Sequence, residues 1–320
     1  MSTQPIAIIG GTGFVGRHLL SELARQGHRC KVLSRRPQRG RHVMVFPGVE
    51  LVDADAHNAD VLEAELAGCH AVINLAGILN QYDRPGERFQ DVHAELPAKI
   101  AKACQVNGVE RLLHMGALNA SAASPSEYLK TKAAGEDAVH AAASETLLVT
   151  SIRPSVIFGW DDDFFNRFAR LIAMIPAVFP VACPQSRFAP VYVEDVVKAF
   201  VHCLKDRGTA GRRYDLCGPE IFTLREVVDY IIKTAGHQRL VLELDDLMAR
   251  IQARMMEFAP GKPFTRDNYL SLQVDSVCDD NGLLELGIAP TPVDAIVPRY
   301  LGIHERNARL SEYRRHAGRG

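Results

Sequence analysis

A tyrosine and a lysine four residues apart, Tyr128 and Lys132, could carry out proton transfer in this chain of 320 residues. The surrounding pattern predicts a helix, and residues four apart share one helix face. A phenol beside an ammonium group has a lowered pKa, so Tyr128 could act as a general acid or base near neutral pH. The chain has eight tyrosines, so the spacing alone is a weak indication of catalysis. The elements that position the pair decide its meaning.

The helix that carries the pair is predicted to begin near Ser124. Pro125 would take the first helical position, and Glu127 follows the serine by three residues, which is the spacing of a capping box. Both side chains therefore belong to the first turns of this helix.

A glycine-rich turn near the N-terminus is a second candidate site. An apolar run at residues 6–9 is followed by glycines and then by an amphipathic pattern, which predicts a strand, a tight turn and a helix. Glycines have no Cβ atoms, so a pyrophosphate could approach the amides at the helix N-terminus. This context predicts a dinucleotide site, and a plain tight turn is the alternative. The residues of the turn are Gly10, Gly11, Thr12, Gly13, Phe14, Val15 and Gly16.

Two arginines follow the second predicted strand. In an NAD site an acidic residue about 20 residues after the glycines accepts a hydrogen bond from the ribose 2′-hydroxyl. No Asp or Glu lies between Glu22 and Glu50, and Ser34, Arg35 and Arg36 occupy this place. A guanidinium suits an additional 2′-phosphate through charge-assisted hydrogen bonds. We therefore expect NADP(H) rather than NAD(H). A solvated basic loop is the alternative, because more basic residues follow.

Predicted strands and helices alternate through the first half of the chain. The segments 30–33, 49–53, 71–77 and 111–115 are predicted strands, of which 71–77 is apolar, and helical patterns separate them. This alternation predicts an α/β fold with a doubly wound parallel sheet and helices on both of its faces.

The pattern changes after residue 159, which predicts a smaller second lobe. We expect a nucleotide-binding domain at 1–159, to which 187–205 returns, and a substrate lobe at 160–186 and 206–303. A basic tail, 304–320, is expected to be disordered.

The second lobe contains an apolar run and a methionine-rich helical segment. Residues 171–181 and 247–272 could line a pocket for a long apolar substrate, although the core of the lobe is the favoured interpretation. Consecutive carboxylates at 161–163 point in different directions, so we interpret them as a solvated loop and predict no metal site. A weak contact of the tail with anionic lipid is the alternative to a solvated tail.

The composition is that of a soluble cytoplasmic enzyme. Hydrophobic residues make up 47% and charged residues 23%, and the formal net charge of −1 gives no case for a nucleic-acid partner. Seven scattered cysteines without a C-x-x-C pair predict reduced thiols rather than disulfides or a zinc site. We expect no signal peptide and no transmembrane segment.

Taken in order, these motifs resemble the extended branch of the short-chain dehydrogenase/reductase superfamily, with its NAD-dependent epimerases and dehydratases. The chain is more closely similar to an atypical subgroup that includes the Rossmann-fold accessory subunit of mitochondrial complex I and a coenzyme Q synthesis protein. The resemblance runs from about residue 5 to about residue 303. The matching segments are 10–16, 74–77, 128–136, 153–159, 190–196 and 264–270.

The resemblance implies a Rossmann fold with a nicotinamide coenzyme site. Glycines of the turn would hold the pyrophosphate, the two arginines the 2′-phosphate, and Asp55 the adenine. Tyr128 would be the proton donor, and Lys132 would bind the nicotinamide ribose and tune Tyr128. The residues expected to bind the coenzyme are Gly10, Thr12, Gly13, Phe14, Val15, Gly16, Ser34, Arg35, Arg36, Ala54, Asp55, Leu75, Ala76, Gly77, Lys132, Pro154, Ser155 and Val156.

One residue of the superfamily pattern is missing. Enzymes of the superfamily place a Ser or Thr hydroxyl at the end of the fifth strand, whereas this chain has Gly116 and Ala117 there. A positioned donor at a developing oxyanion contributes on the order of 2.7–4 kcal/mol. Asn119 or Ser121 would need a displaced loop to substitute.

Two functions therefore stay open. The first is an NADP(H)-dependent oxidoreductase, weak or substrate-restricted, that acts on an apolar carbonyl or quinone-type compound, or a related dehydratase or epimerase. The second is a non-catalytic NADPH-binding accessory or assembly protein linked to complex I or ubiquinone synthesis. The Tyr128 motif favours the first function, and the missing hydroxyl favours the second. We expect an enzyme, with a quinone or isoprenoid-like small molecule as its ligand and a respiratory or quinone-synthesis complex as an alternative partner.

Overall fold

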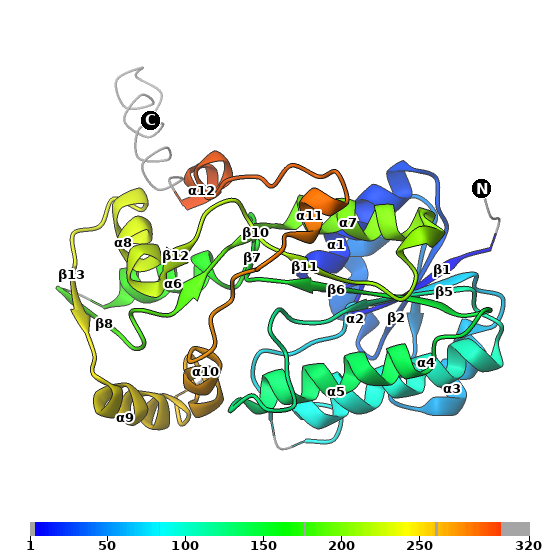
Figure 1. Cartoon of the computed structure of the whole chain (residues 1–320), viewed down its shortest axis with the longest axis horizontal. Coiled ribbons are helices and arrows are strands. Elements are labelled where there is room, and N and C mark those ends of the chain that lie inside the picture. The colour runs from blue at the N-terminus through cyan, green and yellow to red at the C-terminus, as the bar shows by residue number, and fades with distance from the viewer. Residues whose placement is uncertain (1–3, 83, 176, 260–261, 302–320) are drawn as a thin grey trace. The chain divides into compact units, whose positions relative to one another are not determined.

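The computed structural model describes residues 4–301 except 83, 176, 260 and 261 (Figure 1). The expected basic tail lies outside the described residues. The chain divides into two compact units. The first unit comprises Met1–Pro154, Val193–Leu216 and Cys278–Ala289, and the second comprises Ser155–Tyr192, Cys217–Val277 and Pro290–Gly320. The domain boundaries expected from the sequence stay a prediction.

A seven-stranded sheet forms the centre of the first unit. The strand order is β11-β6-β5-β4-β1-β2-β3 and every neighbouring pair is parallel. β1 and β4 are completely buried, as expected for strands covered on both faces. The predicted α/β fold with a doubly wound parallel sheet is confirmed. The strands are β1 (Ile6–Ile9), β2 (Cys30–Ser34), β3 (Val49–Asp53), β4 (Ala71–Asn74), β5 (Arg111–Met115), β6 (Leu148–Pro154) and β11 (Arg213–Leu216).

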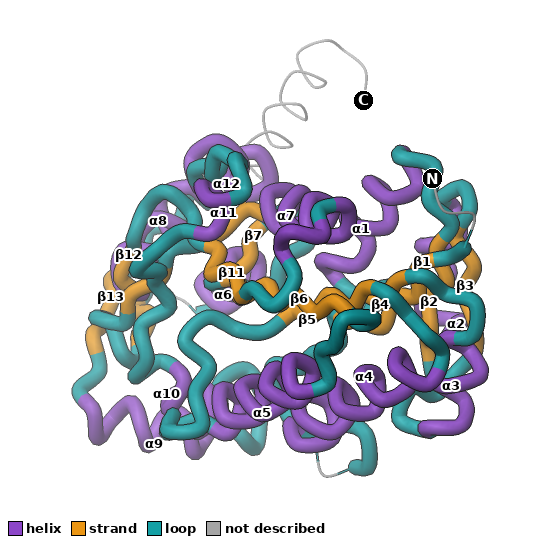
Figure 2. Tube along the Cα trace, turned by 45° about the vertical axis from the view of Figure 1, so that its right-hand side comes forward, coloured by secondary structure: helices purple, strands orange, loops and turns teal. Residues whose placement is uncertain are grey.

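Helices cover both faces of this sheet. On one face α3, α4 and α5 pack side by side, and α1 packs against α7 on the other (Figures 1 and 2). Their inward residues are aliphatic and bury an apolar core with the strands. The main helices of the first unit are α1 (Phe14–Arg25), α3 (Ala59–Leu66), α4 (Leu96–Val106), α5 (Glu127–Ala141) and α7 (Val193–Lys205). Shorter ones are α2 (Pro37–Gly40), α11 (Gly282–Glu285), the π-helix Gln90–Glu95, and the 3-10 helices Arg41–Val45 and Arg207–Thr209.

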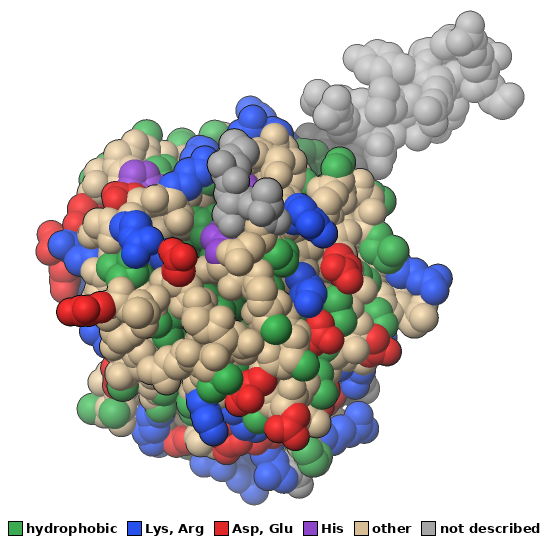
Figure 3. Space-filling model, turned by 90° about the vertical axis from the view of Figure 1, so that its right-hand side faces the viewer, with side chains coloured by type: hydrophobic (Ala, Val, Ile, Leu, Met, Phe, Trp, Pro, Cys, Tyr) green, Lys and Arg blue, Asp and Glu red, His purple; other side chains and the backbone are tan. Residues whose placement is uncertain are grey.

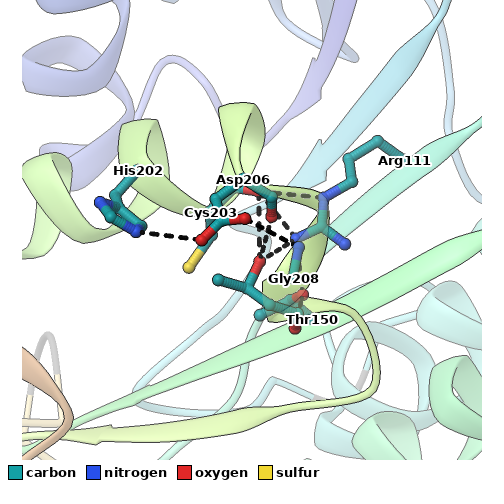
Figure 4. Close-up of polar contacts among 7 residues, drawn as sticks. Arg111, Thr150, His202, Cys203, Asp206 and Gly208 are labelled. Carbon is teal, nitrogen blue, oxygen red and sulfur yellow. Dashed lines mark hydrogen bonds and ion pairs between the residues drawn. The ribbon is translucent and has the colours of Figure 1, made fainter. Parts of the chain in front are cut away.

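A buried arginine joins β5 to the end of α7 (Figure 4). Arg111 is 5% exposed, and its Nε and Nη2 both donate to the Cys203 carbonyl oxygen. Nη2 also donates to the hydroxyls of Thr150, at 2.7 Å, and Thr209. Protein acceptors therefore replace water around the guanidinium, and Arg111 stabilises the packing of β5 against the end of α7.

The second unit has its own aromatic and aliphatic core. α6, α8 and α12 enclose this core, while β8 pairs in parallel with β13, β7 in parallel with β10, and β9 antiparallel to β12. The helices are α6 (Phe165–Met174), α8 (Leu224–Thr234), α9 (Asp246–Met256), α10 (Arg266–Ser271) and α12 (Val293–Leu301). The strands are β7 (Ile157–Phe158), β8 (Val178–Val181), β9 (Arg187–Phe188), β10 (Val191–Tyr192), β12 (Phe222–Thr223) and β13 (Leu240–Glu243).

Two predicted segments of the second unit differ in the structure. The segment 247–272 is two helices rather than one, because Thr265 and Asn268 form a new capping box that starts α10. The solvated carboxylate loop is wrong for Asp162, which is 3% exposed. Its carboxylate accepts from the amides of Gly159 and Phe164 and from the Tyr300 hydroxyl. These donors replace water, while burial raises the pKa of Asp162.

Two further predictions are wrong for particular residues. α5 begins at Glu127 with Ser126 as its cap, because the Ser126 hydroxyl accepts from the Leu129 amide. The Ser124 hydroxyl instead accepts from the Ser126 amide, so it does not cap the helix. Cys217 and Cys278 are disulfide-bonded rather than reduced. Sequence spacing does not reveal which cysteines the fold brings within bonding distance.

No helix in the described part of the chain is long and apolar enough to cross a membrane.

Candidate active site

The glycine turn lies between β1 and α1, and the backbone packing there requires glycine at two positions. Gly10 has φ +80°, and a Cβ at this residue would lie 2.8 Å from the Ala76 nitrogen. A Cβ at Gly16 would lie 2.4 Å from the Gly11 carbonyl oxygen. The Gly13 amide donates to the Gly10 carbonyl, which closes the turn. The turn thus lies against residues 75 and 76, directly after β4, and packs closely against the start of α1.

The N-terminus of α1 offers unpaired amides. Gly13 is its N-cap, no side chain of the described residues caps it, and its first turn contains no acidic residue. The first amides of a helix have no partner within the helix and carry the positive end of its dipole. This end of α1 is therefore suited to an anion such as a phosphate.

The chain after β4 connects the glycine turn to the lysine of the pair. Asn74 is buried, and its Oδ1 accepts from the Ala76 amide while its Nδ2 donates to Nδ1 of His114. A Cβ at Gly77 would lie 3.4 Å from Lys132 Nζ. Leu75 is buried, whereas Gly77 is exposed. The carboxyl ends of β1 and β4 thus bring the two sequence motifs together in the first unit, as expected for a ligand site of a doubly wound sheet.

Lys132 is a buried cation. Its side chain is 4% exposed, and Nζ donates to the Met115 carbonyl oxygen at 3.1 Å. Burial lowers the pKa of Lys132 to about 8, and the carboxylate of Glu136, one turn later on α5, opposes this shift. The ammonium group is still mostly charged at neutral pH.

Tyr128 lies against two aromatic rings. Its ring meets those of Phe89 and His93 edge to face, with centroids 5.8 Å and 5.2 Å away. His93 is 1% exposed, and its Nε2 accepts from the Ile78 amide at 3.0 Å. Burial lowers the pKa of His93 to about 2, so the ring is neutral, and its Nδ1 donates to the Thr131 hydroxyl.

The position without a hydroxyl borders an ion pair. A Cβ at Gly116 would lie 3.2 Å from Cγ of Arg153 and 3.4 Å from Oε1 of Glu136. Glu136 is 2% exposed, and its Oε2 lies 2.8 Å from Nη2 of Arg153. Ala117 is buried. The side chains around this position are therefore charged and tightly held.

The two arginines lie at the opposite, exposed end of the candidate site. Arg35 Nη1 donates to the Gly86 carbonyl, and Arg36 Nη2 pairs with Glu87 Oε1, both at 3.2 Å. The Ser34 hydroxyl accepts from the Arg36 amide. Near them Ala54 is buried, and the exposed Asp55 carboxylate accepts from the His57 amide.

The last three predicted coenzyme-binding residues, 154–156, contact residues of the unit to which each belongs. Pro154 is the last residue of β6, and its carbonyl accepts from the Leu118 amide. Ser155 donates its hydroxyl to the Ser276 carbonyl oxygen at 2.7 Å, and Val156 packs against the core of the second unit. Their placement beside a nicotinamide stays a prediction.

Several residues that contact the predicted site residues were not predicted to belong to the site. Two of them lie inside the matching segments 128–136 and 153–159, on α5 and in β6, whereas the other two lie outside every matching segment. These residues are Glu87, His93, Glu136 and Arg153.

Charges of both signs are interspersed on the face shown in Figure 3, which looks from the right-hand side of Figure 1.

No group of three or more His, Cys, Asp or Glu side chains in the described part could hold a metal ion.

The model of the NAD dependent epimerase/dehydratase family matches residues 6–217. This chain belongs to that family. The match includes the glycine turn, the Tyr128–Lys132 pair and all seven strands of the central sheet. Proteins of this family bind nicotinamide dinucleotides, and the predicted resemblance to it is confirmed.

Two relatives of this family member stand out among curated proteins. The chain is 31% identical over 296 residues to "NADH dehydrogenase [ubiquinone] 1 alpha subcomplex subunit 9, mitochondrial" of Mus musculus, covering 90% of this chain and 77% of the relative. It is 35% identical over 201 residues to a ceramide reductase of Caulobacter vibrioides, covering 61% of this chain and 59% of the relative.

Among solved structures, MoeE5 in complex with UDP-glucose and NAD has a similar fold. The TM-score is 0.70 at 20% sequence identity, covering 95% of this chain and 99% of that protein. This similarity concerns the fold alone.

Proposed function

We propose that this protein is an NADP(H)-dependent oxidoreductase that reduces an apolar carbonyl or quinone-type compound at Tyr128. The observation that carries the proposal is the join between its two motifs. Gly10 abuts Ala76, and Gly77 lies beside Lys132 Nζ, so the glycine turn and the lysine both border the backbone of residues 75–77.

The first unit has a surface that fits the coenzyme. The uncapped amides of α1 and the Cβ-free turn suit the pyrophosphate. Leu75, Ala76 and Gly77 would border the ribose. Arg35 and Arg36 would bind the 2′-phosphate, with Asp55 at the adenine. The coenzyme, when bound, supplies the hydride.

Tyr128 would donate the proton to the oxygen of the substrate. Lys132 would hold a ribose hydroxyl and place a positive charge one helical turn from the phenol. The neutral ring of His93 and the ring of Phe89 would hold the tyrosine ring in place. The name of the Caulobacter relative, a ceramide reductase, supports reduction and an apolar substrate.

A second function, as a non-catalytic NADPH-binding accessory protein, is favoured by one observation. The position of Gly116 has no hydroxyl, and the stem of Arg153 and the Glu136 carboxylate border it instead. The mouse relative is named as a subunit of NADH dehydrogenase, which supports a respiratory complex as the partner. A cytoplasmic location stays a prediction.

The coenzyme assignment is tested by thermal stabilisation. We expect NADPH to raise the melting temperature more than NADH does, because ligand at about 100 times its Kd adds roughly 2.7 kcal/mol to stability. The double variant Arg35→Ala with Arg36→Ala should lose the preference for NADPH. The control, Arg39→Ala with Arg41→Ala, removes the same charge from two exposed neighbours and should keep it. Equal shifts for both coenzymes in the wild type would contradict the assignment.

The two functions are separated by NADPH oxidation with a panel of quinones and apolar carbonyl compounds. We expect Tyr128→Phe to lower the rate by at least about a hundredfold while NADPH binding is retained, because positioned proton transfer contributes about 10²–10⁴ in rate. Tyr82→Phe, at a tyrosine that is 42% exposed, is the control. Rates that are equally low in all three proteins would favour the accessory function.

A further inference from the structure

Arg36 is paired with an acidic residue from a remote turn. Its Nη2 lies 3.2 Å from Glu87 Oε1, and the neighbouring carbonyl of Gly86 accepts from Arg35 at 3.2 Å. Both acceptors thus come from adjacent residues, 51 positions after the arginines they contact.

The turn that presents these acceptors is held by its own hydrogen bonds. The Gly86 amide donates to Asp91 Oδ2 at 2.7 Å, and the Glu87 amide donates to the Arg84 carbonyl at 3.1 Å. Gly86 has φ +71°, and a Cβ there would lie 2.7 Å from Arg35 Nη1. The positive φ of Gly86 favours glycine in this turn, and the hydrogen bonds of the turn fix where the Glu87 side chain begins.

The Glu87 carboxylate is an anion that accepts hydrogen bonds from a guanidinium, as a phosphate does. It is 22% exposed at the side chain, whereas Arg36 is 59% exposed, so the carboxylate is the better-held partner. A ribose 2′-phosphate carries about −1.5 to −2 charge and would approach the same guanidinium. It must share Arg36 with Glu87 and is repelled by it. A 2′-hydroxyl carries no charge and can donate to a carboxylate.

We propose that Glu87 is a specificity-determining residue that competes with the 2′-phosphate for Arg36 and thereby limits the preference for NADP(H) over NAD(H). This inference rests on the coenzyme site proposed above. It deepens that proposal, because the chain lacks an acid at the usual place after β2 and supplies one from a different loop.

The test is the affinity of Glu87→Gln and Glu87→Ala for 2′,5′-ADP and for 5′-AMP, measured by calorimetry at low and high salt. An exposed ion pair contributes roughly 0.2–1 kcal/mol, so both variants should bind 2′,5′-ADP about 1.4- to 5-fold more tightly. Binding of 5′-AMP should stay the same or weaken. The gain should shrink at high salt, because the competing charges are exposed.

Glu95→Gln is the matched control, since this exposed glutamate makes the same change in net charge. The inference is overturned if the Glu87 variants bind 2′,5′-ADP like the wild type, or if Glu95→Gln gives the same gain. The double variant Arg35→Ala with Arg36→Ala distinguishes a failure of the competition by Glu87 from a failure of the coenzyme assignment. If this double variant also leaves 2′,5′-ADP binding unchanged, the coenzyme assignment fails as well. If it weakens binding while the Glu87 variants have no effect, only the competition by Glu87 is excluded.

Discussion

The two ends of the candidate coenzyme site hold their charges in opposite ways. At the adenine end, the Arg36 side chain is 59% exposed and pairs with a partly exposed Glu87. At the tyrosine end, Lys132 is 4% exposed and Glu136 is 2% exposed. Solvent screens the first pair, whereas packed side chains surround the second set.

This difference separates what each end can tolerate. Changing a charge at the exposed end alters ligand preference with little effect on the fold, because water solvates the remaining partner. Removing one partner at the buried end leaves the other charged and without water. Specificity should therefore be easy to change near Arg36, while the surroundings of Lys132 should resist substitution.

The largest expected effect is that of Arg153→Met. Glu136 would lose the guanidinium that lies 2.8 Å away, while Arg213, at 3.8 Å, and Lys132, one turn earlier on α5, would remain near its carboxylate. Breaking a buried ion pair costs about 3–5 kcal/mol, and because Arg213 remains we expect about 3 kcal/mol. Urea denaturation would measure the loss as a change in the free energy of unfolding.

The matched substitution at the exposed end is Arg36→Met. An exposed pair contributes less than about 1 kcal/mol to the free energy of unfolding. If Arg36→Met and Arg153→Met destabilise the protein equally, the contrast between the two ends is wrong.

A smaller, pH-dependent effect is expected for Lys132→Met. Burial lowers the pKa of Lys132 from its ordinary value of 10.5 to about 8. Below pH 8 the lysine is charged in both states, so the folded protein bears the full cost of burying the charge. Above pH 10.5 it is neutral in both states and this cost vanishes, so the free energy of unfolding of the wild type should rise between these values.

The variant should lack this rise, and near pH 7 it should be more stable than the wild type by at most about 3 kcal/mol, the free energy that corresponds to a pKa of about 8 instead of 10.5. The difference between the two proteins, measured by urea denaturation across pH 7–11, isolates Lys132 from other titrating groups. If the free energies of unfolding of the two proteins change in parallel with pH, the pKa of Lys132 is not lowered, and water reaches this side chain.

Local features of the sequence were sufficient for the fold class and for the family. The continuous apolar run at 6–9 predicted a strand, and β1 has those bounds. The glycine turn could be predicted because one of its constraints is local: Gly16 meets Gly11, five residues earlier, whereas the contact of Gly10 with Ala76 joins distant segments. The pattern was less accurate at the start of α5, where either of two serines could cap the helix: Ser126 accepts from the Leu129 amide, whereas Ser124 accepts from the Ser126 amide.

The sequence by itself determined the strand–turn–helix that offers amides to a phosphate, and the helical spacing that places Tyr128 and Lys132 on one face. Both follow from backbone geometry over a few residues. Only the tertiary structure decided which side chains surround them, because those contacts join segments far apart in the chain. The pairing of Arg36 with Glu87 spans 51 residues, and that of Glu136 with Arg153 joins α5 to β6. The surroundings of the candidate site therefore depend on the packing of whole elements, which no local pattern encodes.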